Sequence, residues 1–124
     1  MKPGTLITLS AAIEAATGLA LMAVPGLVAN VLLGAGLSDS GVAVARVAGC
    51  GLLSLGIACW PSGDSAAPAA IRALFVYNLL VGLYLGYLRV AGGFTGLLLW
   101  PACILHILLA LLMARRAFES VRSK

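Results

Sequence analysis

The sequence predicts an all-α integral membrane protein, a four transmembrane helix bundle with a short amphipathic surface helix after the first span. Of its 124 residues, 62% are hydrophobic and only 10% are charged, whereas soluble domains contain about 25% charged residues. The mean hydropathy of +1.11 indicates a chain whose solvent is lipid. Four apolar segments of about 20 residues each match the thickness of a bilayer, because an α-helix rises about 1.5 Å per residue.

The first expected span covers about residues 5–24. We expect it to be retained as a helix and not cleaved as a signal peptide, because it is long enough to cross a bilayer. Pro25-Gly26 ends it. The amphipathic segment, residues 26–34, carries apolar side chains at helical spacing, namely Leu27, Val28, Val31, Leu32 and Leu33. We expect this segment to lie at the membrane surface.

Turn-forming residues separate the other spans. The stretch WPSGDSAAP combines two prolines, a glycine, an aspartate and serines, and it predicts the clearest turn of the chain. Ala91-Gly92-Gly93 predicts a second, shorter turn. The three expected spans cover about residues 42–60, 69–90 and 95–114. All four spans belong to a single membrane domain over residues 1–124.

The distribution of basic residues predicts the orientation. Four spans place both termini on one side of the membrane, and Lys and Arg favour the cytoplasmic side. The basic residues expected on the side of the termini are Lys2, Arg72, Arg115, Arg116, Arg122 and Lys124, whereas Arg89 is expected on the other side. We therefore expect cytoplasmic N- and C-termini in a bacterial inner (plasma) membrane. A basic tail beside a span is typical of topology and anionic lipid contact, not of nucleic-acid binding.

Small residues recur at four-residue spacing on three spans, which predicts close contacts between helices. They are Thr8, Ala12, Ala16 and Ala20 on the first span, Gly41, Ala45 and Gly49 on the second, and Gly82 and Gly86 on the third. This pattern indicates a tight bundle or a dimer face and no particular activity.

Ionisable residues inside the spans predict a buried polar cluster. Charged side chains in hydrocarbon cost roughly 2.5–3.5 kcal/mol on insertion scales, so Glu14, Arg46 and His106 should face the bundle interior. Counting along ideal helices places Glu14, Asn78 and His106 at roughly 12–14 Å from the cytoplasmic ends of their spans. Arg46 comes out at roughly 21 Å, and its long side chain reaches Glu14. We expect each helix to contribute one residue to the cluster.

Six further residues are candidates for lining this cluster: Ser10, Thr17, Tyr77, Tyr84, Trp100 and Pro101. Ser10 and Thr17 flank Glu14 on one face of the first helix. Trp60 and Trp100 are expected near opposite interfaces, as in an aromatic belt. Pro101 is expected either to kink the fourth helix or to open its first turn.

Three roles are open for His106, the only histidine. A haem ligand would need a second ligand from a Met, a Cys or another protomer, and the sequence places none convincingly. A proton acceptor beside a quinone would act with an Asn or Tyr that holds a quinone carbonyl. A simple hydrogen-bond donor would act on Glu14 or on a backbone carbonyl. The whole cluster is either internal glue between helices or a small cavity for a ligand head group or a proton.

Four stretches, IEAATGLALMAVPGLVANVLLG, ARVAGCGLLSLGIACW, YNLLVGLYL and LLLWPACILHILLALLMARR, resemble a group of small bacterial four-helix membrane proteins of DoxX-like type. The resemblance covers most of the chain and includes Glu14, Arg46, Gly49, Trp60, Asn78, Trp100, Pro101 and His106. DoxX is linked to a thiosulfate:quinone oxidoreductase, so the resemblance implies a role beside a quinone. The chain carries no thiosulfate-specific motif, so that enzyme activity is not implied.

The chain is also similar in outline to small multidrug exporters, which have four spans and a glutamate midway along the first, as Glu14 is here. The glutamate of those exporters exchanges protons with a cationic substrate and must be free. The expected contact with Arg46 would neutralise Glu14, and the motifs on the other helices differ. We therefore rank the exporter-like interpretation second.

The sequence favours a non-catalytic membrane subunit or binding protein. Its polar site would hold a lipid-like ligand such as a quinone, or the protein would anchor a redox partner. No GxxxxGK, HExxH or GxSxG motif is present, and Cys50, Cys59 and Cys103 form no CxxC pair that would indicate a metal site. The alternative is a proton-coupled small-molecule transporter acting as a homodimer. Expected partners are the lipid bilayer and a membrane or redox protein or a second copy, not nucleic acid.

Overall fold

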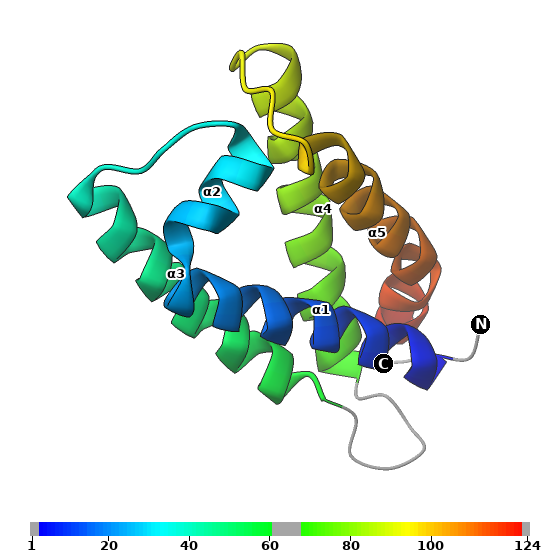
Figure 1. The fold of residues 1–124 in the computed structure, drawn as a ribbon. Coiled ribbons are helices and arrows are strands. Elements are labelled where there is room, and N and C mark those ends of the chain that lie inside the picture. The colour runs from blue at the N-terminus through cyan, green and yellow to red at the C-terminus, as the bar shows by residue number, and fades with distance from the viewer. Residues whose placement is uncertain (1–2, 61–67, 123–124) are drawn as a thin grey trace.

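The computed structural model describes residues 3–60 and 68–122. It contains the helices α1 (Pro3–Ala23), α2 (Pro25–Leu33), α3 (Asp39–Ala58), α4 (Pro68–Val90) and α5 (Leu99–Arg122) (Figure 1). Within the described residues, α1, α3, α4 and α5 are long and apolar enough to cross a membrane. The predicted fold class is therefore confirmed, including the short helix after the first span. The turn expected at WPSGDSAAP lies almost wholly outside the described residues, as do Lys2 and Lys124.

Local sequence explains where α2 begins and ends and where α3 begins. Ser38 caps α3, because its Oγ accepts a hydrogen bond from the backbone N–H of Gly41 at 3.1 Å. Pro25 opens α2 at a position where its missing N–H breaks no helical hydrogen bond. Gly34 closes α2 in the left-handed conformation, with a φ of 72°, which favours glycine.

The last helix begins later than the sequence suggested. α5 starts at Leu99 and not near residue 95, because the preceding segment packs in non-helical form against α2. There the Leu98 N–H donates to the Val31 carbonyl at 3.0 Å. Pro101 is therefore in the first turn of α5, which is one of the two roles considered for it, and at this position it disrupts no helical hydrogen bond.

The four long helices form two pairs, α1 with α3 and α4 with α5, and the pairs are inclined to each other (Figure 1). Glycines let the backbones within a pair approach closely. A Cβ added at Gly56 would lie 2.6 Å from the Ala11 carbonyl oxygen, across the contact of α3 with α1. A Cβ added at Gly82 would lie 2.7 Å from the Ile107 side chain, across the contact of α4 with α5.

The small-residue prediction is right for Gly49 and Gly82 and wrong for the face of α1. Gly49 meets α1 at Gly18, where the two backbones are in direct contact. The small residues that α1 presents to α3 are Ala11, Ala15 and Gly18. Ala16, a member of the predicted face, is exposed. Gly18 decides this rotation of α1, because only a glycine permits so close an approach at that point.

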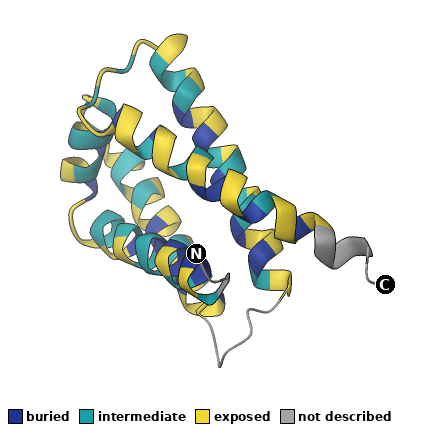
Figure 2. Cartoon of the chain, turned by 90° about the vertical axis from the view of Figure 1, so that its right-hand side faces the viewer, coloured by how far each residue is buried: buried dark blue, intermediate teal, exposed yellow. Residues whose placement is uncertain are grey.

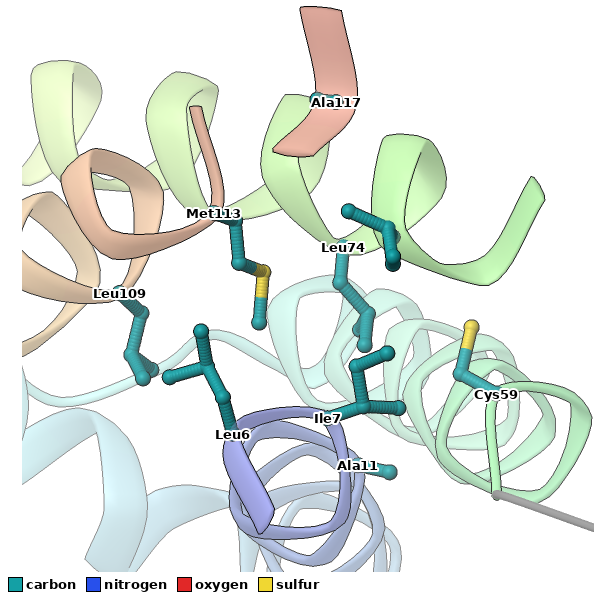
Figure 3. Packing of buried hydrophobic residues seen from close by; sticks show 9 residues of the cluster. Leu6, Ile7, Ala11, Cys59, Leu74, Leu109, Met113 and Ala117 are labelled. Carbon is teal, nitrogen blue, oxygen red and sulfur yellow. The ribbon is translucent and has the colours of Figure 1, made fainter. Parts of the chain in front are cut away.

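Two hydrophobic clusters lie at opposite ends of the bundle, and the first of them joins the two helix pairs. We call the first the basal cluster; its members are Leu6, Ile7, Ala11, Cys59, Ile71, Leu74, Leu109, Met113 and Ala117 (Figure 3). We call the second the roof cluster; it consists of Leu85, Leu99 and Cys103, with Leu32 and Leu33 of α2 packed against them. The roof cluster therefore ties α2 to the α4–α5 pair. Between the two clusters the pairs are held apart.

The outward faces of the helices are apolar. Exposed positions cover the outside of the long helices (Figure 2), and many of them carry large hydrophobic side chains, such as Val47, Leu83 and Leu111. Water would not solvate such a surface favourably, whereas lipid would. The surface thus agrees with the composition in identifying a membrane protein.

Candidate functional site

A partly open cavity of about 490 Å³ lies between the two helix pairs, bounded by residues of all five helices. Its volume is within the usual range of ligand pockets, about 300–1,000 Å³. Most of its wall is aliphatic. Thr17 of α1, Tyr77 of α4 and His106 of α5 are the three lining residues with polar side-chain groups. The cavity is thus an apolar chamber with a few polar atoms on its wall.

A hydrogen-bonded network adjoins the polar wall and joins three helices. Asn78 of α4 is fully buried. Its Nδ2 donates to the Ser10 Oγ of α1 at 3.1 Å and to the Leu74 carbonyl at 2.8 Å. Its Oδ1 lies 2.8 Å from His106 Nδ1 of α5. Asn78 thus satisfies both ends of its amide and holds the His106 ring in place.

Glu14 and Tyr77 lie beside this network. The Glu14 side chain is 1% exposed, and its Oε1 has no hydrogen-bond partner. The Tyr77 side chain lies beside the Glu14 carboxyl group. The Tyr77 ring also meets the His106 ring edge to face, with 5.9 Å between centroids. Tyr77 is therefore the side chain that connects the buried carboxyl group with the cavity wall.

The expected contact between Arg46 and Glu14 is not present. Arg46 is exposed on α3, whereas Glu14 is buried, and no ion pair joins these two described residues. The depth of a residue along a helix does not determine which face of the helix it occupies. α3 packs on α1 through Gly49 and Gly56, and at backbone contact no long side chain fits between the helices. The polar cluster therefore comes from α1, α4 and α5, and α3 contributes only an apolar residue, Leu52, to the cavity wall.

The six candidate lining residues divide into three groups. Thr17 and Tyr77 line the cavity, and Ser10 is buried behind it in the Asn78 network. The other three do not line it and are exposed: Tyr84, Trp100 and Pro101. Tyr84 instead stacks on Tyr87, with 6.2 Å between ring centroids. These three side chains point outward because α4 and α5 turn their small and aliphatic residues towards each other.

Sequence reasoning missed the part of the wall that α2 supplies. Leu27, Val28, Val31 and Leu32 line the cavity. The sequence predicts these side chains as the apolar stripe of an amphipathic helix at the membrane surface, and it does not predict that they line a cavity. The signal was present in the sequence, but its direction depends on how α2 docks on the segment before α5.

Across the residues that the structure describes, no group of three His, Cys, Asp or Glu side chains gathers to hold a metal ion. The Cys103 thiol, which is buried, donates to the Gly82 carbonyl at 3.3 Å and so serves the α4–α5 contact. What the site can do chemically is hold a mostly apolar molecule and form hydrogen bonds with its polar end.

Comparisons of the chain with protein-family models, with curated proteins and with solved structures find no match.

Proposed function

We propose that this protein binds a lipid-like ligand with a polar head group and an apolar tail, such as a quinone. The observation that carries the proposal is the cavity of about 490 Å³. Its aliphatic wall suits a tail, and the side chains of Thr17, Tyr77 and His106 suit a head group. A site that served only to hold helices together would be filled by side chains, as protein interiors normally are.

We infer cytoplasmic termini, because basic residues gather on the terminal side. The resemblance of the sequence to small bacterial membrane proteins supports a bacterial inner membrane. The similarity in plan to DoxX-like proteins supports the quinone as a ligand and a redox protein as a partner. In this scheme the chain is a non-catalytic subunit or binding protein that holds the ligand or anchors that partner.

The proposal is tested by gentle purification from the native membrane, followed by mass spectrometry and an absorption spectrum. Two matched variants on α1 make the test specific. Ala20 lines the cavity and Ala16 is exposed outside it. Ala20→Phe should fill the cavity and remove the co-purifying molecule, whereas Ala16→Phe should leave it in place.

The outcomes separate clearly. A quinone or similar lipid that is retained by the native chain and by Ala16→Phe, and lost from Ala20→Phe, supports the proposal. A molecule retained equally by both variants is bound elsewhere, and a native chain without any stoichiometric ligand contradicts the proposal. A Soret band that is lost when His106 is substituted would show that the ligand is haem and not a quinone.

A second candidate, a proton-coupled small-molecule transporter acting as a homodimer, gains support from one observation. The objection to it was neutralisation of Glu14 by Arg46, but Arg46 is exposed and Glu14 is buried. A carboxyl group without a cationic partner is available to bind a proton. Proteoliposomes with a pH gradient test this candidate: transport must be present, and Glu14→Gln must abolish it without loss of folded protein.

A further inference from the structure

The orientation of the Asn78 amide decides which hydrogen-bonding group His106 offers to the cavity. One amide atom of Asn78 lies 2.8 Å from the Leu74 carbonyl oxygen. A backbone carbonyl can only accept, so this amide atom is the NH₂ group. The other amide atom is then the oxygen, which can only accept. His106 Nδ1, 2.8 Å from that oxygen, must therefore be the donor.

A neutral imidazole carries a single N–H, so a proton on Nδ1 leaves a lone pair on Nε2. Within the described chain, Nε2 has no protein hydrogen-bond partner, and the His106 ring lines the cavity. The histidine therefore presents an acceptor to a bound molecule. The network Ser10–Asn78–His106 fixes this polarity from behind, because every other atom of the Asn78 amide is already engaged.

The other polar groups on the wall do not reverse this preference. The Tyr77 side chain lies beside the Glu14 carboxyl group, whose oxygens compete with a ligand for the hydroxyl proton of Tyr77. Thr17 has a hydroxyl that can donate or accept by rotation, so it selects neither kind of ligand. The rest of the wall is aliphatic.

We propose that the cavity selects a molecule whose head group donates a hydrogen bond to Nε2 of His106: a phenol or hydroquinone in preference to a quinone or an ether. This inference rests on the proposed function and adds to it the chemical class of the head group. A carbonyl oxygen placed at Nε2 would oppose lone pair to lone pair, and a buried acceptor without a donor is unfavourable. The reduced form of a quinone therefore fits the site better than its oxidised form.

The test uses two probes that differ by one O-methyl group, which removes the donor: para-nonylphenol and its methyl ether, para-nonylanisole. Binding to the protein in lipid nanodiscs is measured at about pH 8, where an ordinary histidine is neutral. One hydrogen bond should give the phenol an advantage of roughly three- to tenfold in Kd. His106→Phe should abolish this advantage, and Ala16→Phe, which lies outside the cavity, should retain it.

The single histidine also allows the tautomer to be observed directly. In protein labelled with ¹⁵N-histidine, the His106 nitrogens give the only imidazole signals. We expect a protonated Nδ1 and an unprotonated Nε2 in the native chain. Asn78→Leu removes the acceptor of Nδ1, so the proton should move to Nε2 and the preference for the phenol should disappear.

Each result is decisive. A phenol preference that depends on both His106 and Asn78 supports the inference. Equal binding of both probes, abolished by Ala20→Phe, overturns the inference and leaves the proposed function standing. Tighter binding of the ether, or a proton on Nε2 in the native chain, also overturns it. Binding of neither probe above the level of Ala20→Phe contradicts the inference together with the proposed site.

Discussion

His106 Nδ1 on α5 lies 2.8 Å from Oδ1 of Asn78 on α4, and the Asn78 amide reaches on to Ser10 of α1. Three helices from the two inclined pairs are thus connected through one buried amide. The network closes the cavity on its polar side. It also determines how the only histidine faces whatever the cavity contains.

The Ser10–Asn78 contact should be measurable as a coupling. Asn78→Leu leaves Ser10 and His106 without their partner, and we expect it to lower the free energy of unfolding by about 1–3 kcal/mol. In a double-mutant cycle with Ser10→Ala, the coupling energy should be about 0.6 kcal/mol and at most about 1.7 kcal/mol, as for other hydrogen bonds between membrane helices. Unfolding in mixed detergent, followed by circular dichroism, gives the four values. Strict additivity would mean that the hydrogen bond contributes nothing.

Glu14 and Arg46 should behave independently. Since Arg46 is exposed and Glu14 is buried, Glu14→Gln and Arg46→Leu should have additive effects on stability, within about 0.5 kcal/mol. Arg46→Leu alone should change stability by no more than about 0.5 kcal/mol. Thermal melts of the two single variants and the double variant check this. If the double variant loses less stability than the two single variants together, Glu14 and Arg46 interact, as the sequence predicts.

Glycine contacts between α1 and α3 should tolerate no methyl group. Gly56→Ala places a Cβ 2.6 Å from the Ala11 carbonyl oxygen, and overpacking of this kind costs about 1–3 kcal/mol. Gly51 on the same helix has nothing within 4 Å of an added Cβ. Gly51→Ala is therefore the matched control, with stability unchanged or raised by up to about 1 kcal/mol through helix propensity. Equal melting temperatures for both variants would show that the two helices do not meet at Gly56.

The contact between α2 and the segment before α5 should be weakened when Gly96 is replaced by alanine. A Cβ at Gly96 would overlap the backbone of Leu32 at the end of α2. Gly96→Ala should break the nearby bond from the Leu98 N–H to Val31. Hydrogen exchange at Leu98 should become faster by about tenfold, equal to roughly 1.4 kcal/mol of local stability. Gly36→Ala, where an added Cβ has open space, should leave this exchange rate unchanged.

Much of the fold could be predicted from the sequence because it depends on local properties. Apolar runs of bilayer length and the Pro25 break specify four long helices and one short one without reference to any partner. Asn78 and His106 could be matched by depth alone, since helical rise converts residue number into height. The height of a residue does not determine its rotation about the helix axis, and for Arg46 the prediction of an interior position was wrong for this reason.

The sequence by itself determined that this is a membrane protein of four apolar helices with few polar residues among them. The tertiary structure decided which polar residues meet, because close contact at Gly18 and Gly56 sets the rotation of α1 and α3. It also decided that the pairs splay into a cavity roofed by α2. The rotation of the helices and the presence of the cavity both depend on side-chain volumes where distant segments meet. The periodicity of a single helix carries no information on these volumes.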